Sequence, residues 1–417
     1  MTAFYSILHF MVDGVCAAAM FGNTISGKNG YFLILLYNFC AFALQMPIGV
    51  VLDMLNAEEE RNQKAALRSN GVGQKKKDWN LMTAVTGVLC TIAGAVTHPV
   101  LLGIGNALFH AGGGVGTIFD SRKEKECGRK GLSSAGGEVI RKPDAGGDDV
   151  NRSSDCGREQ KSLLVRLGVF VAPGALGLYL GMLLAKSGNW STGVLCGSAA
   201  MLLLCAAVPW VRLKRPKKTE MVQTSGAETE PVTGTARIRE SGGSPAAEGS
   251  VMLLSICCLL VVILRSYLGM AVAFPWKTGI FAGLLAVFAV AGGKMAGGFL
   301  AAWGGAERTA AVSLVLASVC YLFSSVMPIG LAALFLFNMT MPVTLYWMIL
   351  ALPRKPGFAF GFLTFALFLG FLSSYLDVQT GLAGNVIGSA GSLLSLVILA
   401  IGVGMNRRIG RGRAGTL

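Results

Sequence analysis

Residues 99–119, PVLLGIGNALFHAGGGVGTIF, decide how the rest of the chain is interpreted. This apolar run is long enough to cross a bilayer as a helix, yet it contains Asn106 and His110, which lie four residues apart on one helix face. Six glycines surround the pair and allow a neighbouring backbone to come close, as in a helix packed inside a bundle. Polar side chains at membrane depth are unfavourable unless they face protein or water. The stretch therefore predicts a membrane helix that lines an interior site.

The composition of the whole chain is that of an integral membrane protein. Of 417 residues, 53% are hydrophobic and only 14% are charged, which is too few charges for a soluble chain of this length. The net charge of +14 does not indicate nucleic-acid binding, because 30 of the 36 Lys and Arg residues lie in alternate loops. The positive-inside rule then predicts a multi-pass protein of the plasma (inner) membrane with both termini in the cytoplasm. His9 and Asp13 interrupt the first apolar run, which therefore does not resemble a cleaved signal peptide.

We predict an all-α integral membrane fold of about twelve transmembrane helices in two pseudo-symmetric six-helix bundles. The predicted spans are residues 3–23, 31–53, 80–97, 99–119, 163–185, 190–211, 250–274, 279–303, 309–326, 328–350, 358–376 and 384–404. A cytoplasmic linker, 212–249, separates the N-terminal bundle, 1–211, from the C-terminal bundle and its short basic tail, 250–417. Two cytoplasmic inserts, 54–79 and 120–161, interrupt the first bundle. The polar, Gly- and Ser-containing composition of all three segments predicts disordered inserts and a flexible linker.

An internal repeat supports the division into two halves. Gln45–Asp53 aligns with Lys294–Ala302, and Asn106–His110 aligns with Asn338–Pro342. With a small gap, Asp13 falls opposite Arg265. Together the matches predict two six-helix units related by an axis along the membrane normal, with a central site between them.

Five stretches carry a family resemblance. They are HFMVD at 9–13, QMPIGVVLD at 45–53, GIGNALFH at 103–110, GVFVAPGALGLYLG at 168–181 and GKMAGG at 293–298. On these residues the chain resembles the major facilitator superfamily transporters, and within them the fosmidomycin-resistance-like branch.

The resemblance implies alternating access, with the first, fourth, seventh and tenth helices lining the cavity. It makes Gly49 and Asp53 part of a gating motif between the second and third helices. Pro173 and Gly174 resemble the antiporter motif of the fifth helix, which favours export over uptake. The chain departs from the gating pattern, because the insert 54–79 replaces a short basic turn and Ala302 stands where the second half would carry an acid.

The spans contain few ionisable side chains, and each buried charge needs a reason to be there. His9 and Asp13 lie one turn apart on one face, where an imidazole beside a carboxylate can exchange a proton. We predict that this pair couples transport to protons. A fixed ion pair between Asp13 and Arg265 is the structural alternative, and the two roles are compatible if the pair breaks during the cycle.

Arg265 and Lys294 place two positive charges in the second half, whose helices hold no acid apart from Asp377 near an end. An anionic or phosphonate-like substrate would satisfy both charges. The alternative for Lys294 is that it snorkels towards an interface. The alternative for Asn106 and His110 is a hydrogen bond that packs two spans together. The predicted substrate-binding residues are Asn106, His110, Arg265, Lys294 and Asn338.

No enzyme motif stands out: the chain contains no DDxxD, GxSxG or HExxH pattern and no phosphate-binding loop. Eight of the ten cysteines lie in apolar spans, and Cys127 and Cys156 lack metal-ligand spacing. We therefore expect no enzymatic activity, cofactor or metal, and reduced thiols. Energy for transport would come from an ion gradient.

The leading hypothesis is a monomeric secondary active transporter that exports a small organic, drug-like or anionic solute by alternating access, coupled to protons. Its partners would be that solute, protons and the lipid bilayer. A proton-coupled nutrient symporter is the alternative. A transport-inactive membrane sensor or scaffold that signals through the inserts is the third hypothesis.

Overall fold

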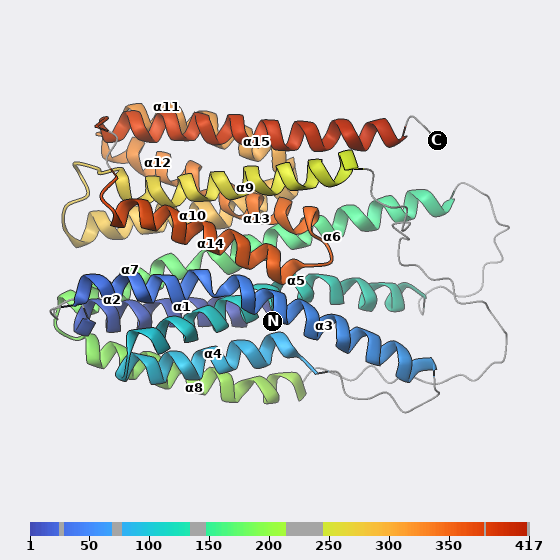
Figure 1. The fold of residues 1–417 in the computed structure, drawn as a ribbon, viewed down its shortest axis with the longest axis horizontal. Helices are drawn as coiled ribbons and strands as arrows, with labels where there is room; N and C mark the ends of the chain where they lie inside the picture. The colour runs from blue at the N-terminus through green and yellow to red at the C-terminus, as the bar shows by residue number, and fades with distance from the viewer. Residues whose placement is uncertain (25–28, 69–76, 134–146, 214–244, 379–380, 415–417) are drawn as a thin grey trace.

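The computed structural model describes residues 1–24, 29–68, 77–133, 147–213, 245–378 and 381–414, and over these ranges it contains helices and no β-strand (Figure 1). Ten helical stretches of the described part are long and apolar enough to cross a membrane. The N-terminal half consists of α1 (Thr2–Ala19), the π-helical η1 (Met20–Thr24), α2 (Gly30–Asn38), the π-helical η2 (Phe39–Ala43), α3 (Gln45–Arg68), α4 (Trp79–Val96), α5 (Pro99–Ser133), α6 (Gly147–Val171), α7 (Pro173–Lys186) and α8 (Trp190–Leu213).

The C-terminal half occupies the yellow-to-red part of Figure 1. It consists of α9 (Pro245–Ala271), α10 (Gly279–Gly304), α11 (Ala306–Leu322), α12 (Met327–Asn338), α13 (Thr340–Ala351), α14 (Pro356–Tyr375) and α15 (Gly384–Ala414). Counting α2–α3, α6–α7 and α12–α13 as one passage each, the two halves contain six passages apiece. The predicted twelve-helix fold is confirmed.

Three passages are broken, and a proline accounts for each break. A proline lacks an N–H and its ring clashes with the carbonyl four residues earlier. Accordingly η2 ends at Ala43, four residues before Pro47, and α12 ends at Asn338, four residues before Pro342. Pro173 begins α7 directly after the bend at Ala172.

The predicted disorder of the inserts is wrong for their helical parts. Residues 54–68 continue α3, residues 120–133 continue α5 and residues 147–161 belong to α6. Runs of good helix formers such as those in 57–67 extend a membrane helix at little cost once it has nucleated. The rest of both inserts, linker residues 214–244 and the side chains of Cys127 and Cys156 lie outside the described part.

We call the end of the bundle at which α3, α5 and α6 extend the insert end, and the opposite end, near the α7–α8 turn, the far end (Figure 1). The charge pattern predicts that the insert end is cytoplasmic. Two crossings join the halves towards this end, and both consist of glycines. Gly49 of α3 meets the backbone of Gly357 in α14, and Gly298 of α10 meets the backbone of α6 at Gly168.

These two crossings are equivalent positions of the internal repeat, because Gly49 and Gly298 are aligned residues. The same passages also touch at the far end, where α2 contacts α14 and α7 contacts α10. There the Tyr31 and Tyr375 rings stack with centroids 4.1 Å apart, and Tyr179 donates a 2.7 Å hydrogen bond to Ile280 O. The halves are therefore in contact at both ends in this conformation.

Candidate substrate and coupling site

Four polar side chains from α1 and α5 converge in the N-terminal half, and we call His9, Asp13, Asn106 and His110 the His–Asp cluster. His9 Nε2 lies 3.2 Å from Asp13 Oδ2, and His110 Nε2 lies 3.5 Å from Asp13 Oδ1. Asn106 Nδ2 donates to the same Oδ1 over 3.3 Å. Asp13 keeps 19% of its side chain exposed and His110 keeps 12%. The structure thus brings together the two pairs that four-residue spacing placed on single helix faces.

A backbone carbonyl orients each imidazole of the cluster. His9 Nδ1 lies 2.7 Å from Phe170 O, and His110 Nδ1 lies 2.9 Å from Asn106 O. Because a carbonyl only accepts, each Nδ1 carries a hydrogen, and each Nε2 of a neutral ring turns its lone pair towards Asp13. Two lone pairs then face a carboxylate. This arrangement is favourable only with a proton or another cation among the three groups.

The break at Pro173 helps to build the cluster. It interrupts the helix next to Phe170, so that the carbonyl of Phe170 is available to His9. Gly174 then leaves room for the pair: a Cβ there would collide with His9 Nε2 and Asp13 Oδ2. The residues that resemble a helix-five motif therefore also position the predicted proton pair.

A second polar group, Arg265 of α9, lies in the C-terminal half. Its side chain is buried, with 7% of the residue exposed. Nη2 donates to Thr340 Oγ1 over 2.6 Å, whereas Nε and Nη1 have no hydrogen-bond partner among the described residues. The predicted alternative of a fixed Asp13–Arg265 ion pair is absent from the described contacts of this conformation, in which the carboxylate of Asp13 faces the two histidines.

Lys294 of α10 interacts electrostatically with both the His–Asp cluster and Arg265. It lies within range of the charge of Asp13 across the interface and of Arg265 in its own half. It has no ion pair among the described residues. Two cations therefore lie near each other in the C-terminal half without a described acid to neutralise Arg265.

The remaining predicted residues have other hydrogen-bond partners. Asn338 donates to Leu334 O of its own helix over 2.8 Å. Asp53 caps α14: its Oδ1 accepts from the N–H of Gly357 over 2.7 Å and its Oδ2 from the N–H of Phe358 over 2.8 Å. Gly49 lies one turn before Asp53 at the glycine crossing. A cavity of about 690 Å³ lies elsewhere, between α11, α13 and α15 at the insert end, and none of the predicted site residues lines it.

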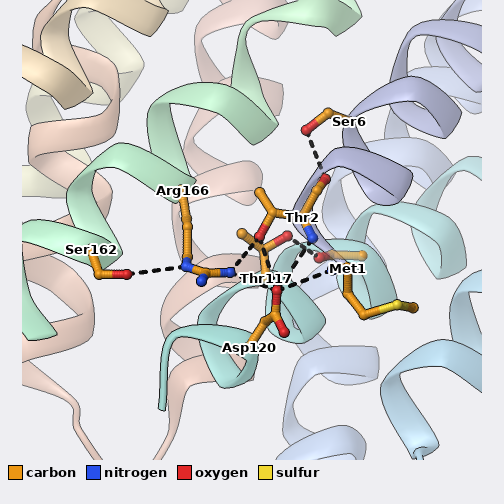
Figure 2. A network of polar contacts seen from close by, with 8 residues as sticks. Met1, Thr2, Ser6, Thr117, Asp120, Ser162 and Arg166 are labelled. Carbon is orange, nitrogen blue, oxygen red and sulfur yellow. Dashed lines mark hydrogen bonds and ion pairs between the residues drawn. The ribbon is translucent and has the colours of Figure 1, made fainter. Parts of the chain in front are cut away.

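Two polar residues were missed from the sequence. Thr340 has no charge and no spacing signal, yet it is the side-chain partner of Arg265. Arg166 was not singled out from the sequence, but it binds Asp120 over 2.6 Å and Thr2 over 3.0 Å, as Figure 2 shows. Asp120 lies just beyond the predicted span 99–119. Although burial raises the pKa of its carboxyl, the positive charges of the Met1 amino group and Arg166 lower it overall.

Comparison with known proteins adds structural but no sequence relatives. No family model matches the chain, and the search of curated proteins found no significant match. Among solved structures, the chain is similar to the major facilitator superfamily transporter FucP in its outward conformation, with a TM-score of 0.50, 11% identity and coverage of 97% of this chain and 99% of that one. A variant of the E. coli fucose:proton symporter FucP gives a TM-score of 0.49, 12% identity and 97% coverage of both chains. At 11% identity, the first of these similarities shows the fold alone. The chain therefore has the fold of a major facilitator superfamily transporter.

Proposed function

We propose that the protein is a secondary active transporter that moves a small anionic organic solute by alternating access, coupled to protons. The observation that carries the proposal is Arg265, a buried guanidinium with two unpartnered nitrogens. A buried cation without a counter-charge is unfavourable by several kcal/mol. A carboxylate or phosphonate that accepts from Nε and Nη1 would remove that penalty through charge-assisted hydrogen bonds.

Lys294 supports the same solute chemistry. Its charge adds to that of Arg265, so an anion between them would be attracted by both. Thr340 holds one edge of the guanidinium and leaves the other nitrogens for the solute. We propose Arg265 and Lys294 as the main anion-binding residues, with Asn106, His110 and Asn338 as the remaining predicted contacts.

The His–Asp cluster supports proton coupling. The two Nε2 lone pairs and the carboxylate need at least one shared proton to lie as they do, and that proton can leave when Asp13 gains another partner. Asp13 and His9 would therefore bind and release the coupled proton.

The contacts between the halves support alternating access. Asp53 and Gly49 join α3 to α14 towards the insert end, and tyrosines join the same halves at the far end. A transport cycle requires that these contacts open in turn. Pro173 and Gly174 would let α7 move relative to α6.

Solute binding is tested by thermal unfolding of the purified protein with small carboxylates, dicarboxylates and alkylphosphonates, each beside its neutral amide or alcohol analogue. An anion at about 100 times its Kd stabilises the folded state by about 2.7 kcal/mol. Arg265→Gln should abolish this stabilisation. Arg308→Gln is the matched control, because Arg308 is exposed at the start of α11. Equal stabilisation by neutral analogues, or none by any anion, would overturn the anionic solute.

Coupling and direction are tested in proteoliposomes with an imposed pH gradient, using an anion that passes the binding test. Accumulation in acid-inside vesicles indicates exchange for protons, the mode proposed for export. Accumulation in alkaline-inside vesicles indicates symport, the alternative direction. Asp13→Asn should remove the effect of the gradient but keep solute counterflow. A full gradient response in Asp13→Asn would remove Asp13 from coupling.

A further inference from the structure

We infer that His9, Asp13 and His110 form a binding site for a divalent transition-metal ion of the Zn²⁺ or Co²⁺ type. The two imidazole nitrogens and one carboxylate oxygen lie within 4.8 Å of one another. Two ligand atoms about 2.1 Å from a tetrahedral ion lie about 3.4 Å apart. His9 Nε2 lies 3.2 Å from Asp13 Oδ2 and His110 Nε2 lies 3.5 Å from Asp13 Oδ1, so each imidazole is close to this separation from one of the two carboxylate oxygens.

The hydrogen bonds around the three ligands are those of a preformed metal site. A metal-binding histidine usually donates its other ring N–H to a carbonyl or carboxylate, which turns its free lone pair towards the ion. Both imidazoles do so here, to Phe170 O and Asn106 O. The side chain of Asn106 in turn holds the carboxylate of Asp13. All three ligands are thus oriented before any ion arrives.

The electrostatics of the cluster also favour an ion over a single proton. One proton can bridge only two of the three lone pairs, whereas a metal ion binds all three at once. Two imidazoles and one carboxylate suit Zn²⁺, Co²⁺ or Fe²⁺ better than Mg²⁺ or Ca²⁺, which prefer oxygen ligands. The remaining exposure of Asp13 leaves a fourth position for water or an exchangeable ligand.

The inference concerns binding alone and does not depend on transport. A metal ion and a proton would compete for the same lone pairs, but metal binding is measured in the resting protein without any solute or gradient. Lys294 provides an opposing charge, since its ammonium lies within electrostatic range of Asp13. Its removal should therefore tighten metal binding.

The test is a Co²⁺ titration of the purified full chain in detergent, freed of polyhistidine tag and stripped of metal. We expect one Co²⁺ per chain, visible absorption bands of a low-coordinate nitrogen–oxygen site, and displacement by Zn²⁺. His9→Asn and His110→Asn should each weaken binding by more than the roughly 10- to 100-fold typical of losing an outer-shell partner. Asn106→Leu, which keeps all three ligands, should weaken it by about 10-fold. Lys294→Gln should tighten it.

His98→Asn is the matched control, because the chain has three histidines and His98 is the exposed one outside the cluster. It should leave the titration unchanged. Absence of stoichiometric Co²⁺ binding by the wild-type chain overturns the inference. So does a thiolate-to-cobalt charge-transfer band, which would assign the ion to cysteines, and so does wild-type affinity in His9→Asn or His110→Asn. The titration of the wild-type chain can refute the site by itself, so the test does not depend on every variant folding.

Discussion

Removal of the Asp53 carboxylate should loosen the insert end of the bundle. Its two oxygens accept from the first free amides of α14 over 2.7 Å and 2.8 Å, across the interface between the halves. Each charge-assisted hydrogen bond of this kind contributes about 1.5 kcal/mol or more, and a carboxylate at a helix N-terminus adds up to about 2 kcal/mol when partly buried. Because these contributions overlap and Asp53 is partly exposed, we expect a net loss of about 2 kcal/mol in Asp53→Ala.

A loss of about 2 kcal/mol shifts the equilibrium between closed and open insert ends by about 30-fold towards the open state. Hydrogen exchange of the peptide that contains Gly357 and Phe358 measures this shift directly, since their amides are the donors. Their exchange should accelerate by about 30-fold, while the far-end peptide that contains Tyr375 becomes no more exposed. Glu58→Gln is the control, because it removes an exposed acid from the same helix. Unchanged protection at Gly357 and Phe358 in Asp53→Ala would refute the proposed cap.

Two further predictions test the interior and the helix ends. Gly174→Ala introduces a Cβ that collides with the His9–Asp13 pair. A displacement of these side chains by about 1 Å should slow gradient-driven uptake by about 100-fold. Gly269→Ala is the control and should transport normally, because a Cβ there has no neighbouring atom within 4 Å. Asp120→Asn should lower the thermal unfolding midpoint at neutral pH by removing a charge from the network in Figure 2. Because the pKa of Asp120 is lowered in the folded state, its stabilisation is present above the unfolded pKa and is lost as the pH falls through the folded pKa. The difference between wild type and variant should thus shrink below about pH 4, and a constant difference down to pH 3 would contradict the ion pair.

The sequence predicted the passages well because apolar length and loop charge are local signals. Nearly every helix core lies where hydropathy placed it, as for 279–303 against Gly279–Gly304. The helical extensions into the inserts were missed, since polar composition indicates exposure and does not distinguish an exposed helix from a disordered chain.

The two pairs within the N-terminal cluster were accessible from spacing, because residues four apart share a helix face, whereas their convergence on Asp13 was not. The partner of Arg265 could not be predicted in this way. Thr340 reaches Arg265 because of how α9 and α13 are positioned relative to each other, which hydrophobic periodicity does not reveal. Pro47 and Pro342 indicate the helix breaks near them. The predicted spans 31–53 and 328–350 were nevertheless continuous, because average hydropathy stays high across a proline.

The glycine crossings also bear on the proposed movement of the two halves. At Gly49–Gly357 and Gly168–Gly298 the two halves meet main chain to main chain, and the Asp53 carboxylate also reaches across to Gly357. If the halves move as proposed, contacts of this kind leave few side-chain rotamers to rearrange, whereas an interface of interdigitated side chains would have to repack. A side chain introduced at either crossing would push the two helices apart and keep the insert end open.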